Sequence, residues 1–402
     1  MNQSFCPLPF IEYCNTTGNM LKLCCESENI GPKEHESIIE DFEKHSVLNE
    51  VRRKMLAGER VKFCSNCYDW EDTGGDSPRL DRLRETDPKL LQKALEGEIE
   101  LASLDLKFGN VCNLACTMCE PTNSSLISDH VKKDPGKDLR KFDTIDSIPS
   151  YHKFEMSALD ELDFSKITRV KSTGGEPMLQ EGFYEFVDRL DEQCSLRIVT
   201  NGTIDLVPYW NMFASKKYVS INFSAEGINE TYNHNRWPSK FSKFERNIRK
   251  ILEKQNKEKL KHIRFCISSA VGVLTFHETH KLMQWIIDLN KEFSFDHDPI
   301  LELDLDIVRD PLHSQPALAP EDFIQKAIEE MQNLIAGKED IFHNADDFTK
   351  VLKNQSDNID PREKKKGLRQ LKSACAWWSR NRNLDYFSLP IIQKTLDQLK
   401  ER

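Results

Sequence analysis

The alternation of hydrophobic and polar positions divides the chain into strand-like and helix-like segments. Six short apolar or alternating runs predict strands, and helical periodicity fills most of the intervals between them. The predicted strands are 101–108, 168–173, 195–200, 217–224, 262–271 and 300–308, and the predicted helices include 180–193, 240–257 and 276–291. Because strands alternating with helices are typical of parallel βαβ units, we expect an α/β fold.

The regions on either side of this alternation have different patterns. Residues 10–14 and 19–24 flank Thr16-Thr17-Gly18 and predict a hairpin, and helical spacing over 47–58 ends at Gly58. A Gly/Pro-rich boundary at 73–78 precedes a predicted charged helix over 79–97. Residues 133–165 form a polar insertion, and 320–402 are charged with helical periodicity.

Composition narrows the functional classes. Lys and Arg total 56 against 66 Asp and Glu, a formal charge of −10, so we expect no nucleic-acid partner. No run approaches 18 apolar residues, and no basic segment followed by an apolar one opens the sequence, so we expect a cytoplasmic protein with no membrane partner. Twelve cysteines without a secretion signal indicate metal binding or catalysis before disulfides.

The sharpest motif is KFGNVCNLACTMCEP, which spaces Cys112, Cys116 and Cys119 as C-x3-C-x2-C after the first predicted strand of the alternation. Three thiolates can hold three irons of a 4Fe–4S cube and leave the fourth iron open for an external ligand. A structural zinc site is the alternative, but it needs a fourth ligand, and the next histidine, His130, is eleven residues away.

Further motifs follow the next strands in order. STGGEP (172–177) follows the second, TNGT (200–203) the third and SAEGINETYNHNR (224–236) the fourth. Each alone is compatible with a turn, a helix cap or surface charge. With the cysteine triplet, they resemble the radical S-adenosylmethionine (SAM) enzymes. Their S-x-D-G-x-x-E-x-x-D-x-x-R motif is changed here, with Glu226 and Asn233 replacing the two Asp and Arg236 retained.

The resemblance implies a cluster on Cys112, Cys116 and Cys119 whose unique iron holds the amino and carboxylate groups of SAM. It also implies that Glu176 accepts from the SAM ammonium and that Arg236 pairs with the SAM carboxylate. Met118 replaces an aromatic residue that usually stacks on adenine. The predicted SAM contacts are Met118, Gly174, Gly175, Glu176, Asn201, Ser224, Glu226, Arg236 and Ser268.

A second cysteine group lies near the N-terminus. Cys6, Cys24, Cys64 and Cys67 have a C-x17-C…C-x2-C pattern that resembles the twitch domain, the shorter relative of the SPASM domain, although in the family it follows the barrel. On spacing alone, four thiolates fit an auxiliary 4Fe–4S cluster or zinc equally well. The radical SAM resemblance favours the cluster. Cys25 can substitute for Cys24.

The combined interpretation has three parts. We expect a twitch-like domain over 1–78, a partial (β/α)6 TIM-like barrel over 99–315 and a helical extension over 316–402. By resemblance, the enzyme reductively cleaves SAM to a 5′-deoxyadenosyl radical, which abstracts hydrogen from a peptide or protein side chain.

Three points stay open at this stage. A sugar or nucleotide is the alternative substrate, and a zinc-stabilised binding module without catalysis is the alternative class. A flavodoxin- or ferredoxin-type protein is the expected electron donor. Cys266, on a barrel strand, is a candidate hydrogen donor, whereas burial as a small apolar side chain is the ordinary role of a free cysteine.

Overall fold

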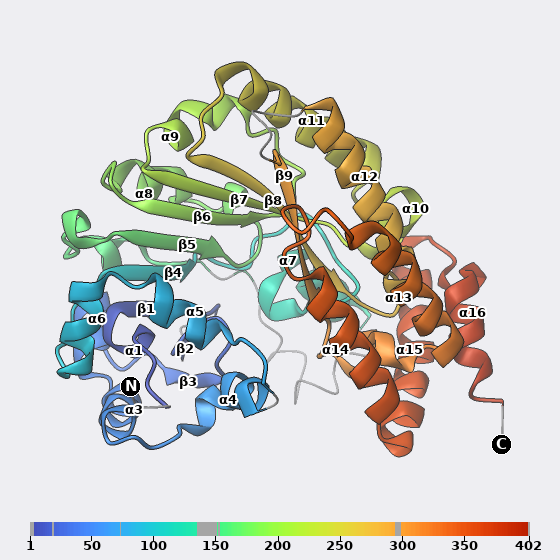
Figure 1. Cartoon of the computed structure of the whole chain (residues 1–402), viewed down its shortest axis with the longest axis horizontal. Coiled ribbons are helices and arrows are strands. Elements are labelled where there is room, and N and C mark those ends of the chain that lie inside the picture. The colour runs from blue at the N-terminus through green and yellow to red at the C-terminus, as the bar shows by residue number, and fades with distance from the viewer. Residues whose placement is uncertain are drawn as a thin grey trace. The chain divides into compact units, whose positions relative to one another are not determined.

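The structure is a computed structural model that describes residues 4–17, 20–72, 74–134, 151, 153–293 and 299–400. Within these residues, nine strands form one sheet in the order β3-β2-β1-β4-β5-β6-β7-β8-β9. The strands are β1 Glu12–Asn15, β2 Met20–Lys22, β3 Asn29–Pro32, β4 Ser103–Lys107, β5 Arg169–Thr173, β6 Ser195–Thr200, β7 Tyr218–Ser224, β8 Ile263–Val271 and β9 Leu301–Ile307. All six strands predicted for the alternating region are present, which confirms the α/β class (Figure 1).

Two compact units make up the chain. The first contains Met1–Asn110, Tyr151–Ile198 and Ser215–Val219, and the second contains Val111–Ser150, Val199–Ala214 and Ser220–Arg402. The helices are α1 Leu8–Ile11, α2 Ile38–Lys44, α3 Ser46–Leu56, α4 Ser65–Asp72, α5 Pro78–Glu85, α6 Pro88–Leu95, α7 Ser125–Lys133, α8 Phe183–Arg189, α9 Trp210–Ala214, α10 Asn229–Asn235, α11 Phe241–Glu258, α12 Thr279–Glu292, α13 Glu321–Ile335, α14 Ala345–Asn358, α15 Pro361–Arg382 and α16 Pro390–Asp397.

In the first unit, the N-terminal hairpin joins the sheet. β1 pairs antiparallel with β2 and parallel with β4, so the cysteine-rich N-terminus shares one sheet with β4 and β5. One face of β4, β5 and β6 is apolar and buried, with Leu104, Val170 and Leu196 in adjacent register. Phe108 packs against Phe183 of α8, which supplies aromatic side chains to the core of this unit.

In the second unit, β8 and β9 pair in parallel and carry the helical C-terminal region. α12 and α14 pack against β9, and α13 packs against both helices (yellow to red in Figure 1). α15 also holds the end of α7, because Trp377 donates its indole N–H to the carbonyl of Asp134 at 2.7 Å. Asn381 donates to the Asp134 carboxylate at 2.9 Å, and Tyr386 donates to the carbonyl of His234 at 2.5 Å.

One predicted element is wrong. The single charged helix expected over 79–97 is two helices, α5 and α6, separated at Thr86 and Asp87. Pro88 has no N–H to donate and disfavours helical backbone at the residue before it. Asp87 caps α6 by accepting from the backbone N–H of Lys89 at 2.9 Å. The proline was therefore the signal for the break.

Parts of two other expectations lie outside the described residues. The structure does not describe most of the polar insertion over 133–165 or Gly18 of the predicted hairpin turn. The four helices α13 to α16 confirm the helical C-terminal region. The partial barrel and the separate N-terminal domain stay predictions.

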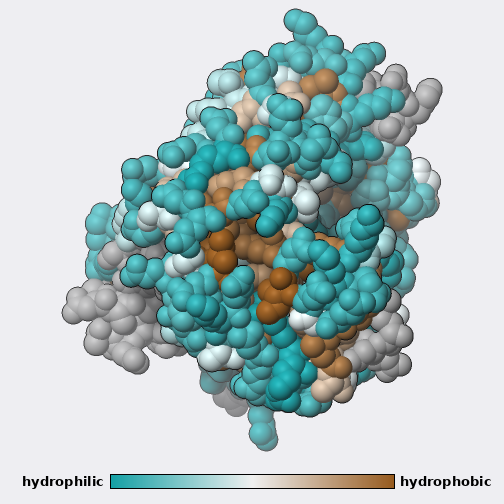
Figure 2. Space-filling model, turned by 90° about the vertical axis from the view of Figure 1, so that its left-hand side faces the viewer, coloured by the Kyte–Doolittle hydropathy of each residue, from teal (hydrophilic) through white to brown (hydrophobic). Residues whose placement is uncertain are grey.

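The surface matches the charged composition. The face drawn in Figure 2 is mainly hydrophilic, with hydrophobic residues gathered in a smaller hollowed area. Across the part of the chain that the structure describes, no helix combines the length and apolar character needed to cross a membrane.

Candidate functional site

The loop that carries Cys112, Cys116 and Cys119 is held within the second unit by hydrogen bonds to its middle residues. The backbone N–H of Ala115 donates to the carbonyl of Trp237 at 2.7 Å, and that of Thr117 donates to the carbonyl of Asn235 at 2.9 Å. Ser124, the N-cap of α7, donates its hydroxyl to the carbonyl of Leu114 at 2.7 Å. The segment after α10 and the start of α7 therefore determine where the cysteines lie.

The three thiols are close enough to influence one another. Burial, together with Cys116 and Cys112, raises the pKa of the Cys119 thiol. Burial also raises the pKa of Cys116, and the Arg236 guanidinium acts against this rise. Iron binds thiolates, so these groups lose their protons when a cluster is assembled.

Two polar side chains direct N–H groups at these sulfurs. Asn201 Nδ2 lies 3.8 Å from Cys112 Sγ, and Arg236 Nη1 lies 3.8 Å from Cys116 Sγ. Hydrogen bonds to cluster sulfurs stabilise the negative charge and adjust the reduction potential. The donor set of three thiols with N–H groups directed at two of them fits an iron–sulfur cluster.

Arg236 also has a partner that the sequence did not indicate. Its Nε donates to Glu226 Oε2 at 2.7 Å, its Nη2 bonds Glu226 Oε1, and both side chains are buried. Asn235 Nδ2 donates to the same Glu226 Oε2 at 2.7 Å. Burial lowers the pKa of Arg236, but Glu226 and Cys116 outweigh it and hold the guanidinium charged. The predicted contact of Arg236 with SAM stays a prediction.

Asn201 belongs to a side-chain network that sequence analysis missed. Its Nδ2 donates to Asn113 Oδ1 at 2.8 Å, and its Oδ1 accepts from the hydroxyl of Thr203 at 2.7 Å. Asn113 in turn donates to Thr203 Oγ1 at 2.9 Å. Asn113 lies directly after Cys112 in the motif, but nothing in the spacing of the motif indicates its partner.

Gly174, Gly175 and Glu176 lie in the first unit, at the end of β5. Gly174 has φ +116°, and a Cβ there would lie 3.0 Å from the carbonyl oxygen of Gly109, so only glycine fits without strain. Gly175 donates its N–H to that same carbonyl at 3.0 Å. Glu176 is fully buried, and its Oε1 accepts from the backbone N–H of Met178 at 3.2 Å. The motif is therefore a tight turn closed by a buried carboxyl cap.

The remaining predicted residues of the second unit lie on or after strands. Ser224 ends β7, and Ser268 and Cys266 share one face of β8. Ser268 accepts from Asn222 Nδ2 at 2.9 Å, and the Cys266 thiol lies 3.5 Å from the carbonyl of Ile267. Met118 is partly buried in the cysteine loop. No contact in the structure tests the roles predicted for these four residues.

The four N-terminal cysteines line one pocket in the first unit. Cys6 precedes α1, Cys24 follows β2, Cys64 ends a short 3-10 helix and Cys67 lies in α4. Burial raises the pKa of Cys64 to about 12, with Cys67 contributing. Burial likewise raises the pKa of Cys6, with Cys64 and Cys67 contributing, so these sulfurs lie near one another.

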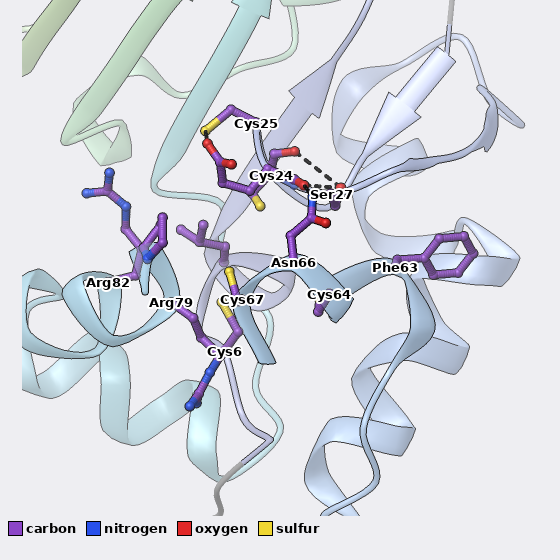
Figure 3. A pocket seen from close by; sticks show the side chains of 13 residues that line it. Cys6, Cys24, Cys25, Ser27, Phe63, Cys64, Asn66, Cys67, Arg79 and Arg82 are labelled. Atoms are coloured by element: carbon purple, nitrogen blue, oxygen red, sulfur yellow. Dashed lines mark hydrogen bonds between the residues drawn. The ribbon is translucent and has the colours of Figure 1, made fainter. Parts of the chain in front are cut away.

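Cys24 and Cys25 point in different directions. In Figure 3 the sulfurs of Cys6, Cys24 and Cys67 are directed toward the same space, whereas the Cys25 sulfur points away from it. The Cys25 thiol lies 3.7 Å from Glu26 Oε1, and burial followed by Cys25 and Cys6 raises the pKa of Cys24. Cys24 therefore faces the same space as Cys6 and Cys67.

Arg79 closes one side of this pocket. Its Nη1 donates to the carbonyl of Phe5 at 2.7 Å, and its Nε donates to Glu71 Oε1 at 2.9 Å. The charge of Arg79 acts to lower the pKa of Cys6 and Cys64. Across the described ranges, no three Cys, His, Asp or Glu side chains are grouped to hold a single metal ion.

Comparisons with known proteins address the loop of Cys112, Cys116 and Cys119 and the strands that follow it. Residues 106–286 match the sequence model of the Radical SAM superfamily. That segment, less than half of the chain, is therefore similar to the Radical SAM superfamily, a class of SAM-dependent enzymes that bind a 4Fe–4S cluster. No curated protein matches the sequence.

Solved structures of SuiB from Streptococcus suis are partly similar. The structure of SuiB bound to precursor peptide SuiA is 13% identical, with a TM-score of 0.37, covering 72% of this chain and 64% of that chain. The structure bound to S-adenosylmethionine is 13% identical, with a TM-score of 0.37, covering 72% and 63%. This chain therefore spans just under two thirds of the length of SuiB.

Proposed function

We propose that this protein is a radical SAM enzyme that abstracts hydrogen from a peptide or protein side chain. The observation that carries the proposal is the loop of three thiols with N–H groups of Asn201 and Arg236 directed at two of them. This loop lies within the segment that matches the family.

In this proposal Cys112, Cys116 and Cys119 hold the cluster. When bound, a 4Fe–4S cluster with an open iron supplies the electron that cleaves SAM to methionine and a 5′-deoxyadenosyl radical. The chain itself orients the thiolates, stabilises their charge through Asn201 and Arg236, and keeps water from the reacting groups.

Arg236 retains the capacity to contact SAM. A guanidinium has five N–H donors. Glu226 uses two of them and Cys116 one, so two are left for the carboxylate of SAM. We propose that Glu226 and Asn235 position Arg236 for this contact. The proposed SAM contacts also include Met118, Gly174, Gly175, Glu176, Asn201, Ser224, Glu226 and Ser268.

For the N-terminal pocket we propose an auxiliary 4Fe–4S cluster on Cys6, Cys24, Cys64 and Cys67. Four thiols that converge from four segments supply the donors of a closed site. The nearby Arg79 charge favours thiolates over thiols. Zinc is the competing occupant of such a site.

The substrate, the electron donor and the hydrogen donor rest on the resemblance to the twitch and SPASM group. We propose a peptide or protein side chain as substrate, with a sugar or nucleotide as the alternative, and a flavodoxin- or ferredoxin-type electron donor. Cys266 is the proposed hydrogen donor if the product is an epimer. In that case alone, Cys266→Ala would abolish turnover.

The test is anaerobic reconstitution followed by iron, sulfide and zinc analysis and an assay for 5′-deoxyadenosine with dithionite and SAM. About eight irons per chain with deoxyadenosine formed would support two clusters and radical chemistry. Cys112→Ala should lose deoxyadenosine, whereas Cys194→Ala, a buried cysteine outside both groups, should retain it.

Two other results would change the proposal. About four irons with deoxyadenosine retained would keep the radical chemistry and remove the auxiliary cluster. Zinc without iron, and no deoxyadenosine, would contradict the enzyme and favour the zinc-stabilised binding module.

A further inference from the structure

One face of the sheet in the first unit is polar, although both faces of a parallel sheet are usually apolar. The side chains of this face alternate with the buried apolar residues of β4, β5 and β6. The pairing register places them in two rows, Glu12–Ser103–Arg169–Ser195 and Cys14–Asp105–Lys171–Arg197, with Lys107 one step further along β4.

Cations outnumber anions on this face. We call Lys107, Arg169, Lys171 and Arg197 the cation face, and the carboxylates that share it are Glu12 and Asp105. This surplus lies in a chain whose formal charge is −10.

Both carboxylates are already engaged. Asp105 Oδ2 lies 3.2 Å from Lys171 Nζ, and Glu12 Oε2 accepts from the hydroxyl of Ser103 at 2.7 Å. Burial, and then Asp105, raises the pKa of Glu12, which weakens its capacity as a counter-ion.

Lys107 is the clearest sign of a missing partner. The side chain is half-buried, and no carboxylate among the described residues forms an ion pair with its ammonium group. Burial lowers the pKa of Lys107, and Lys22 and Lys171 lower it further against the opposing effect of Asp105. A shielded ammonium beside other cations is stabilised when an anion binds next to it.

Arg169 has a similar environment. Burial, and then Arg82, lowers its pKa against the opposing effects of Glu12 and Glu85, and its ion pair with Glu85 Oε2 is long, at 3.8 Å. Guanidinium groups suit carboxylate and phosphate because their planar N–H donors match two oxygens at once. The cation face therefore has both a point charge and planar donors for an oxyanion.

The cation face adjoins the pocket of the N-terminal cysteines. Cys25 lines that pocket, and it acts to raise the pKa of Lys171. Arg82, which acts on Arg169, lines the same pocket. An anion held by the cation face would lie beside the proposed auxiliary cluster.

We propose that the cation face binds an anionic group of the substrate, a carboxylate or a phosphate. This inference rests on the proposed function, because it assigns the substrate of that reaction a negative charge. A carboxylate belongs to an acidic peptide, and a phosphate belongs to a nucleotide or sugar phosphate.

The experiment is anaerobic calorimetric titration of the reconstituted full chain with three probes. These are inorganic phosphate, glutarate and its neutral diamide, glutaramide. We expect one anion to bind at least about tenfold more tightly than glutaramide, since charge-assisted hydrogen bonds are stronger than those between neutral groups. Tighter glutarate would identify a carboxylate, and tighter phosphate a phosphate.

Variants test whether the cation face is responsible. Lys107→Met should remove most of the preference for the anion, and Lys107→Arg should restore it. Lys44→Met, an exposed lysine of α2, is the matched control and should bind as the wild type does. Circular dichroism and iron content check that each variant is folded and loaded.

Three results would overturn the inference. They are no preference for either anion, an unchanged preference in Lys107→Met, and a loss of SAM affinity in Lys107→Met equal to the loss of anion affinity. Deoxyadenosine assayed in the wild-type samples separates the two proposals. If it forms without an anion preference, only this inference fails, and if it never forms, the proposed function fails.

Discussion

The two cysteine groups of this chain are built differently. Cys112, Cys116 and Cys119 come from one loop whose backbone is fixed by hydrogen bonds, and two side-chain N–H groups are directed at their sulfurs. Cys6, Cys24, Cys64 and Cys67 come from four separate segments that meet in one pocket.

Under the proposed function, the difference corresponds to two kinds of chemistry. Three ligands leave one iron of a cube open to an external molecule, whereas four ligands close the site. Side-chain N–H groups are directed at the sulfurs of the loop. In the pocket, burial raises the pKa of the Cys6 thiol and the charge of Arg79 acts against this rise. We therefore expect reactivity at the loop, and electron transfer or structural support at the pocket.

The largest expected effect comes from removing one thiol at each site. Cys116→Ala should abolish deoxyadenosine formation, because the loop has no fourth cysteine to replace it. Cys64→Ala should lose about four irons and reduce deoxyadenosine formation by a smaller factor. Iron analysis and product assay of both variants are the measurement. Equal losses of deoxyadenosine formation in the two variants would contradict the different roles expected for the loop and the pocket.

A second effect concerns the ion pair of Glu226 with Arg236, the arginine that contacts Cys116 of the loop. Glu226→Gln leaves the buried Arg236 guanidinium without its counter-ion, so the free energy of unfolding should fall by about 3 kcal/mol. Denaturant unfolding of the protein without iron measures this. Glu230→Gln, at an exposed carboxylate of α10, is the control and should change it little. Similar stability of the two variants would show that Glu226 does not support the loop.

The smallest effect is a pH dependence of the free energy of unfolding of the metal-free protein, caused by Cys64 in the pocket. Burial raises the pKa of Cys64 from 9.0 to about 12, so the folded chain holds this proton more tightly than the unfolded chain. The resulting stability is fully present below about pH 9 and is lost as pH rises toward about 12. Cys64→Ser, which does not titrate in this range, should flatten that part of the curve. Unchanged curvature in the variant would show that Cys64 does not titrate as its burial requires.

The sequence predicted features that depend on local pattern. Alternation located the six strands, and cysteine spacing located both groups of thiols, because neighbouring residues determine both. The break between α5 and α6 was also readable, since Pro88 cannot continue a helix.

Features that depend on folded contacts were beyond the sequence. The pair of Glu226 with Arg236 and the network of Asn113, Asn201 and Thr203 join side chains that no spacing rule connects. Polar and apolar residues alternate in the sequence of each strand of the cation face. The sequence of one strand does not show which side chains of the neighbouring strands lie beside its own polar side chains. Only the register of the sheet brings Asp105 beside Lys171.

The attachment of α15 to α7 limits where this chain can be truncated. Asp134 receives hydrogen bonds from Trp377 and Asn381, and Tyr386 donates to the carbonyl of His234 in the last turn of α10. A truncation after about residue 315 would remove these partners from the unit that carries Cys112, Cys116 and Cys119. The C-terminal helices are therefore an integral part of that unit, and recombinant fragments should be designed to retain them through Tyr386.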